Sequence, residues 1–141
     1  QITDGYPELK KEREEKRENR RFLGIIDREK RNDIYNIADV FLLPSYNELF
    51  PRALLENCSV GNPFIVRDLS LYDPILPSSS IRAKDIDDFS SLLQRRKNDK
   101  DFYEQGKEVS REIKRTYSEE NIYQLWKDYY FRIYRKYKEE K

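Results

Sequence analysis

The chain has 141 residues, of which 37% are hydrophobic, enough for one compact domain that buries roughly two-thirds of the surface its unfolded chain exposes. Its 28 Lys and Arg residues nearly balance 27 Asp and Glu residues, and the net charge of +1 gives no reason to expect a nucleic-acid partner. The absence of histidine excludes His-based catalytic triads and His-ligated zinc sites. The single cysteine, Cys58, cannot form an internal disulfide.

No segment approaches the ~18 apolar residues that a membrane-spanning helix needs, and the N-terminal sequence has neither signal-peptide nor transit-peptide character. We therefore expect an intracellular, cytoplasmic protein. The sequence contains no methionine, so we expect the chain to be a piece of a longer protein.

The first third of the chain alternates between charged and apolar segments. Residues 8–21 are almost purely charged, which predicts a solvated helix. Residues 22–26 form a short apolar run that predicts a buried strand. Asp27 is placed to cap a following helix, and its apolar residues share one face: Ile34, Ile37 and Ala38.

Residues 40–43 are continuously apolar and end at Pro44, a pattern typical of a strand buried on both faces of a parallel sheet. Pro51 is expected at the first position of a new helix, and Gly61 closes that helix. Residues 64–66 predict the next strand.

After Leu76 the pattern becomes helical. Residues 77–80 have the composition of a loop. Three further helices are predicted beyond it, with N-terminal caps expected at Asp87 or Asp88, at Asp101 and at Ser118.

The predicted fold class is α/β: a partial, Rossmann-like parallel sheet with flanking helices and a helical C-terminal tail. We expect a single domain over residues 1–141. Within it, residues 1–76 would form the α/β portion and residues 85–141 the helical tail.

Two glutamates mark the candidate site. Glu48 lies in the loop at the carboxyl end of a predicted strand, where ligands bind in open α/β sheets, and Glu56 lies in the helix that follows. The unpaired N–H groups expected at Leu49, Phe50 and Arg52, with the positive end of the helix, suit a diphosphate. A ligand that offers hydroxyls to the carboxylates and phosphates to the amides is a nucleotide-sugar.

These residues resemble the retaining glycosyltransferases of the two-Rossmann-domain GT-B fold, family GT4, whose signature is Glu-x7-Glu. Pro44-Ser45 precedes the two glutamates and Gly61-x-Pro63 follows them, as in that family. The resemblance runs from about Ile2 to Tyr130 and includes three more matches: a distorted Gly-Asp-Gly-Pro over residues 4–7, Phe22-Leu23-Gly24, and Ile34-Tyr35-Asn36-Ile37-Ala38-Asp39-Val40-Phe41.

The resemblance implies a role for each residue of the motif. Glu48 would be the catalytic-site carboxylate that contacts the hydroxyls of the transferred sugar. Glu56 would bind the ribose hydroxyls of the nucleotide. The backbone of Leu49 and Phe50 would hold the diphosphate.

The implied reaction is transfer of a hexose from a nucleotide-sugar, UDP-glucose or UDP-galactose, by front-face attack with retention and with no obligatory metal or other cofactor. Pro51 and Arg52 complete the expected donor-binding set. The departing nucleoside diphosphate needs its growing charge stabilised, and Arg52 and Arg67 are the candidate cations.

The sequence also departs from the family. The N-terminal acceptor domain and the basic elements that open the family's donor domain are absent, so the isolated chain is expected to be inactive. Asn57 stands where the family has Ala.

A narrower resemblance concerns the acceptor. Residues 67–72, with residues 48–51, are similar to bacterial diacylglycerol glucosyl- or galactosyltransferases that make membrane glycolipids. Aromatic residues interleaved with Lys and Arg near the C-terminus suit either contact with the missing N-terminal domain, which we weigh higher, or a peripheral site on the inner face of the membrane.

Two alternative functions stay open: a non-catalytic module that docks on a membrane or partner, and a sugar-nucleotide epimerase of the same fold. Asp85-Ile86-Asp87 matches a metal-binding Asp-x-Asp, but its position before a predicted helix favours capping over a metal site. Cys58 lies in an apolar helical run and is interpreted as a core residue.

Overall fold

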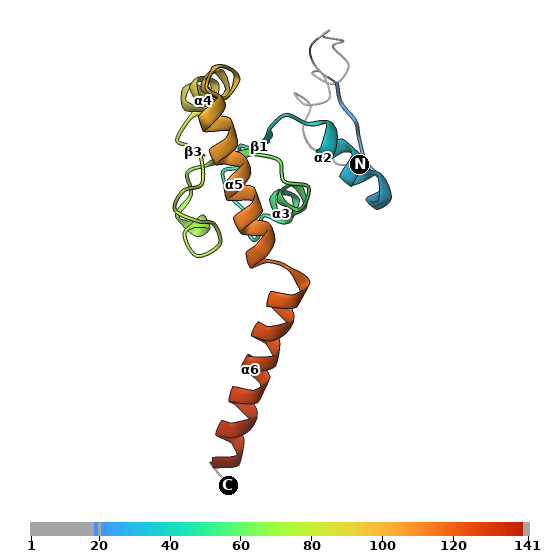
Figure 1. The fold of residues 1–141 in the computed structure, drawn as a ribbon, viewed down its shortest axis with the longest axis vertical. Coiled ribbons are helices and arrows are strands. Elements are labelled where there is room, and N and C mark those ends of the chain that lie inside the picture. Colours follow the sequence, from blue (N-terminus) through green and yellow to red (C-terminus); the bar gives the residue numbers. More distant parts are fainter. Residues whose placement is uncertain (1–18, 20, 140–141) are drawn as a thin grey trace. The chain divides into compact units, whose positions relative to one another are not determined.

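A computed structural model describes residue 19 and residues 21–139 (Figure 1). The chain divides into two compact units, Gln1–Arg31 and Asn32–Lys141, and each is described by itself. The helix predicted over residues 8–21 lies almost entirely outside the described residues.

In the described part of the first unit, residues 22–26 are not a strand, so that prediction was wrong. Gly24 takes a positive φ of 70°, which breaks the extended run, and the Ile25 side chain is 84% exposed. Asp27 precedes the 3-10 helix η1 (Arg28–Lys30), but its side chain makes no capping hydrogen bond. Its carbonyl instead accepts from the Lys30 amide at 3.0 Å.

The second unit contains a parallel sheet of three strands in the order β1 (Phe41–Leu43), β2 (Phe64–Arg67) and β3 (Arg82–Ala83). Phe41 pairs with Phe64 and Val66 pairs with Arg82. The predicted parallel α/β sheet is therefore confirmed. The sequence did not predict β3, because two residues carry no periodicity.

Helices cover both faces of this sheet. On one face α3 (Arg52–Ser59) and α5 (Lys100–Thr116) contribute buried residues to a core shared with β2, which includes Leu54, Cys58, Phe64, Val66, Val109 and Ile113. On the other face α4 (Ile86–Asn98) packs Phe89 against Ile65 and Ala83.

β1 lies at one edge of the described sheet and is only half-buried. Leu42 pairs with the buried Ile65 but is itself 39% exposed. The prediction that residues 40–43 are buried on both faces was therefore wrong. The cause is position: the α4-side core is built on β2 and β3.

Pro51 and Gly61 bound α3 on its two sides. Pro51 precedes the helix as its N-cap, one residue earlier than predicted, and Gly61 follows its end with a φ of 82°. The Gly61 amide donates to the Cys58 carbonyl at 3.0 Å, so the predicted stop is confirmed. In α2 (Arg31–Ile37) the predicted apolar face is only half-buried, and Ile37 is exposed.

The caps of α4 and α5 lie two or three residues before the predicted ones. The Asp85 carboxylate accepts from the Asp88 amide at 2.9 Å, and the Asp99 carboxylate accepts from the Phe102 amide at 3.0 Å. The expected caps were Asp87 or Asp88 and Asp101. Each aspartate in question stands near another, and only the backbone conformation selects the one whose side chain turns back.

The last helix, α6 (Glu119–Glu139), follows α5, and Ser118 precedes it as the predicted N-terminal cap (Figure 1). The Ser118 hydroxyl accepts from the Asn121 amide at 3.3 Å. The described part of α6 buries no side chain. None of the helices in the described ranges combines the length and hydrophobicity that crossing a bilayer requires. The 3-10 helix η2 (Ser70–Tyr72) completes the elements, in the connection between β2 and β3.

Candidate functional site

Arg67 ties together the loops at the carboxyl edge of the sheet. It ends β2, is only 7% exposed, and donates from Nε to the Pro44 carbonyl at 2.9 Å and from Nη1 to the Lys84 carbonyl at 3.1 Å. Pro44 follows β1 and Lys84 follows β3. The guanidinium also lies 3.8 Å from the centre of the Tyr46 ring, a cation–π contact. Arg67 therefore fixes the edge at which ligands bind in such sheets.

An open cleft of about 560 Å³ lies beside this arginine. Its walls come from the loop after β1 and from the start of α4, and the residues are Tyr46, Arg67, Lys84, Asp85, Ile86 and Asp87. Both aspartates of the Asp-x-Asp segment thus line the cleft, but the carboxylate of Asp85 is engaged as a helix cap. In the part of the chain that the structure describes, no cluster of three or more acidic or thiol side chains could hold a metal ion.

Glu48 lies half-buried in the loop between β1 and α3. The Ser45 hydroxyl donates to Glu48 Oε1 at 2.9 Å and so orients the carboxylate. The pKa of the fully buried Tyr72 is raised, mainly by burial and in addition by the negative charge of Glu48. The Tyr72 hydroxyl has no hydrogen-bond partner among the described residues.

Glu56 lies half-buried in α3, about 6 Å along the helix axis from its first residue. The Tyr35 hydroxyl donates to Glu56 Oε2 at 3.2 Å. Tyr35 is held in turn at its backbone, because the Asn62 side-chain amide donates to the Tyr35 carbonyl. Asn62, in the turn before β2, thus holds Tyr35, and Tyr35 in turn donates to Glu56.

The buried Asn57 stabilises the same turn. Its Nδ2 donates to the Asn62 carbonyl at 3.0 Å, and the Ser110 hydroxyl of α5 donates to that carbonyl too. This explains a residue that sequence reasoning left uninterpreted. The supporting roles of Tyr35, Asn62 and Ser110 were also missed, since each depends on contacts between residues far apart in the chain. The only signal was Tyr35's place in one of the matching segments.

The loop that leads into α3 presents free amides. Among the described residues, neither Leu49 nor Phe50 makes a hydrogen bond through its backbone N–H. The Arg52 amide, predicted to be free as well, donates to the Phe50 carbonyl at 2.9 Å, so that prediction was wrong. Pro51 has φ −80° and ψ 63°, which closes an inverse γ-turn and takes up this donor. The Arg52 side chain is exposed.

Phe50 connects this loop to the end of α5. Its ring packs edge-on against Tyr117, with 6.4 Å between ring centres. The Tyr117 hydroxyl donates to the Ile75 carbonyl at 2.9 Å, which anchors that ring to the segment after η2. The free amides therefore belong to a loop held at both ends.

Cys58 is a core residue, as the sequence indicated. The thiol is fully buried, and burial raises its pKa to about 11 against the weaker opposing effect of its contact with Ser110. A thiol that stays protonated at neutral pH is not a nucleophile.

The parallel sheet with helices on both faces agrees with the comparison with known protein families. The family described as glycosyl transferases group 1 matches residues 5–113, which is most of the chain. The chain belongs to this family, known also as GT4.

A curated relative narrows the comparison. The chain is 40% identical over 133 residues to an alpha-galactosylglucosyldiacylglycerol synthase of Streptococcus pneumoniae. The match covers 92% of the chain but only 34% of that protein, so the chain spans about a third of the relative's length. No solved structure matches the chain.

Proposed function

We propose that the chain is the donor-binding part of a retaining hexosyltransferase that uses a nucleotide-sugar, specifically a UDP-sugar. The observation that carries the proposal is the pair of half-buried, oriented carboxylates, Glu48 and Glu56, separated in the chain by a loop with two free amides. Family membership supports a nucleotide-sugar donor. We propose in addition that the base is uracil and that the transferred sugar is a hexose.

Each group then has a chemical role. Glu48, oriented by Ser45, accepts hydrogen bonds from hydroxyls of the transferred hexose. Glu56, held by Tyr35, accepts from the ribose hydroxyls. The amides of Leu49 and Phe50 donate to the diphosphate.

The same loop favours the departure of the nucleoside diphosphate. Negative charge grows on the diphosphate as the glycosidic bond breaks, and preorganised donors with the positive end of α3 stabilise it without reorganising. The exposed Arg52 side chain supplies a cation at this end of the helix. Arg67 acts differently from a free cation, since two of its donors already hold the neighbouring loops.

For the whole protein we propose a glycolipid acceptor at the cytoplasmic face of a membrane. The printed name of the relative is that of a diacylglycerol glycolipid synthase, which supports this acceptor class. We further propose that residues 1–141 are one donor domain and that acceptor binding resides in a separate N-terminal domain. By this division the chain alone binds donor but does not transfer sugar.

The test is saturation-transfer NMR of the chain with UDP, UDP-glucose, UDP-galactose and GDP-mannose. We expect transfer to the uridine nucleotides that disappears in Glu56→Gln, because the amide removes the negative charge and replaces one of the two acceptor oxygens with a donor group. The matched control is Glu112→Gln, the same change at an exposed site of α5. Transfer to no nucleotide from a folded chain, or equal transfer in both variants, would overturn the proposed site.

Of the two alternatives, family membership favours the transferase over an epimerase. A docking role is favoured by a separate observation, the exposed aromatic side chains of α6. Docking and donor binding are compatible, because they use different elements.

A further inference from the structure

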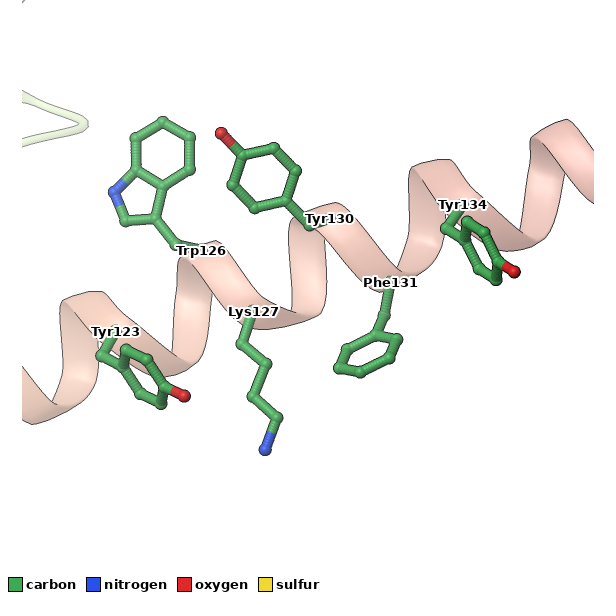
Figure 2. Close-up of a pocket in the computed structure, with 6 residues that line it drawn as sticks. All are labelled: Tyr123, Trp126, Lys127, Tyr130, Phe131 and Tyr134. Atoms are coloured by element: carbon green, nitrogen blue, oxygen red, sulfur yellow. The ribbon is translucent and has the colours of Figure 1, made fainter.

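The aromatic side chains of α6 do not by themselves identify a ligand. Figure 2 shows Trp126 and Tyr130 side by side on this helix, and their ring centres lie 5.7 Å apart. The described part of α6 buries no side chain, so nothing in it shows what covers these rings. We expect the separate N-terminal domain to cover them. The aromatic residue that calls for another explanation is buried, and it is Tyr72.

Tyr72 belongs to the core that anchors the loop carrying Glu48. This loop, residues 44–51, is called the donor loop below. Tyr72 is fully buried in the core on the α3 and α5 side of the sheet. Leu43, which ends β1 just before the donor loop, packs against the same core, and Leu54, at the start of α3, is part of it. Both ends of the donor loop are therefore fixed to the core that contains the Tyr72 ring.

The Tyr72 hydroxyl is buried without a hydrogen-bond partner among the described residues. An unsatisfied buried donor is destabilising, and phenylalanine would fill the same space without that cost. The half-buried Tyr117, by contrast, donates from its hydroxyl to the Ile75 carbonyl at 2.9 Å. A tyrosine at position 72 is therefore unfavourable for the free chain. A partner that arrives when a ligand binds would account for it.

Glu48 is the acceptor that fits this hydroxyl. The negative charge of its carboxylate adds to burial in raising the pKa of Tyr72, and no other charged group among the described residues contributes to that shift. The Ser45 hydroxyl donates to Glu48 Oε1, whereas Oε2 accepts no hydrogen bond from the described residues. A carboxylate offers acceptor positions on both oxygens, so two protein donors still leave room for hydroxyls of a sugar.

Tyr72 is fixed in place, whereas Glu48 has freedom to rotate. The Tyr72 amide donates to the Leu69 carbonyl at 3.0 Å, and the Tyr72 carbonyl accepts from the Leu76 amide at 2.8 Å. Asp73, the next residue, pairs with Arg82 of β3 at 2.6 Å. Glu48 lies in a loop without helix or strand, and one described hydrogen bond holds its side chain. The two groups would therefore meet by movement of the Glu48 side chain toward a stationary hydroxyl.

We propose that Tyr72 is a positioning residue of the donor site: when the hexose binds, its hydroxyl donates to Glu48 Oε2 and, together with Ser45, fixes the plane of the carboxylate. The inference rests on the proposed function, because it names a residue that acts on the donor hexose through Glu48. Tyr72 itself contacts neither the sugar nor the diphosphate.

The test separates the hexose from the nucleotide. Calorimetric titration measures the dissociation constants of UDP, UDP-glucose and UDP-galactose for the wild-type chain and for Tyr72→Phe. We expect the constant for UDP to stay within about twofold and the ratio of the UDP-hexose constant to the UDP constant to rise at least about fivefold, since the lost hydrogen bond forms only with the hexose bound. An unchanged ratio would overturn the proposal.

The matched control is Tyr103→Phe. This change removes the hydroxyl of a half-buried tyrosine whose ring lies 4.5 Å from the Arg96 guanidinium, where α5 meets α4. We expect both dissociation constants to stay as in the wild type. A rise of the ratio equal to that in Tyr72→Phe would contradict a specific role for Tyr72.

A double-mutant cycle shows whether Tyr72 acts through Glu48. In the Glu48→Ala background the acceptor is gone, so we expect Tyr72→Phe to change the ratio by about twofold or less. An effect as large as in the wild type would mean that Tyr72 acts through another group, and the proposal would fail.

Urea denaturation separates positioning from packing. Because Tyr72→Phe removes an unpartnered hydroxyl and keeps the ring, we expect its urea midpoint to equal or exceed that of the wild type. A lower midpoint would show that the hydroxyl already has a partner in the free chain, which contradicts the proposal. UDP binding with an unchanged ratio would overturn the role of Tyr72 alone. A folded chain that binds neither UDP nor a UDP-hexose would overturn the donor site and this role with it.

Discussion

Tyr35 connects Glu56 to the turn before β2, since its hydroxyl donates to the Glu56 carboxylate and its carbonyl accepts from the Asn62 side chain. In Tyr35→Phe the ring keeps its edge-on contact with Phe41, but the hydrogen bond to the carboxylate is lost. We expect stability to fall by about 1 kcal/mol and UDP saturation transfer to weaken. Urea denaturation and the NMR experiment measure the two effects, and Tyr123→Phe, which removes an exposed hydroxyl on α6, is the control. Unchanged UDP binding in Tyr35→Phe would separate Tyr35 from the site.

Cys58 predicts how stability depends on alkaline pH. Its pKa is raised by burial from 9.0 in the unfolded chain to about 11 in the folded one. Below pH 9 the thiol is protonated in both states, so its contribution is fully present. Between the two pKa values only the unfolded chain loses the proton, and stability falls by roughly 3 kcal/mol.

The measurement is urea denaturation across that pH range for the wild type and Cys58→Ala. The pKa values of Tyr72 and Tyr117 are raised as well, by burial, so part of the slope remains in both proteins. The difference between the two slopes belongs to the thiol. Parallel curves would show that Cys58 titrates alike in both states.

At the residue scale, the sequence predicted the structural roles of those residues whose chemical type determines the role. Cys58 as core, Gly61 as a helix stop and Ser118 as a cap are confirmed. The Arg52 amide was misjudged because a free N–H is a property of the turn geometry at Pro51, which residue type alone does not give.

At the scale of the elements, two alanine substitutions at the start of α4 compare the observed cap, Asp85, with the predicted cap, Asp87. Asp85→Ala removes the carboxylate that accepts from the Asp88 amide, and we expect a loss of about 1 kcal/mol. Asp87→Ala alters an exposed residue of the first turn and should cost a few tenths of that. Chemical denaturation of both variants measures the two losses of unfolding free energy. A larger loss in Asp87→Ala would restore the predicted cap.

Elements with buried, periodic side chains were predictable, and the short or marginal ones were not. β2 and the helices on both faces of the sheet follow apolar spacing. β3 is two residues long and exists through its pairing with β2. α5 shows a further limit: Gly106 lets the helix approach closely, since a Cβ there would lie 2.9 Å from Pro63 Cβ, a contact no pattern reveals.

For the whole molecule, the exposure of α6 predicts that the α/β core folds without it. A chain that ends after Ile122 loses no buried side chain of the described helix. We expect its urea midpoint and free energy of unfolding to match those of the full chain within about 0.5 kcal/mol. A marked fall in stability would show that α6 packs on the core.

The carboxyl edge of the sheet has a dynamic consequence that follows from Arg67. The buried Arg67 guanidinium donates to the Pro44 and Lys84 carbonyls. If either loop moved away, this donor would lose its partner unless water entered the edge. The loops after β1 and β3 should therefore open together or not at all. In native-state hydrogen exchange, the amides of these two loops would share one opening free energy, and the edge would behave as a single cooperative unit.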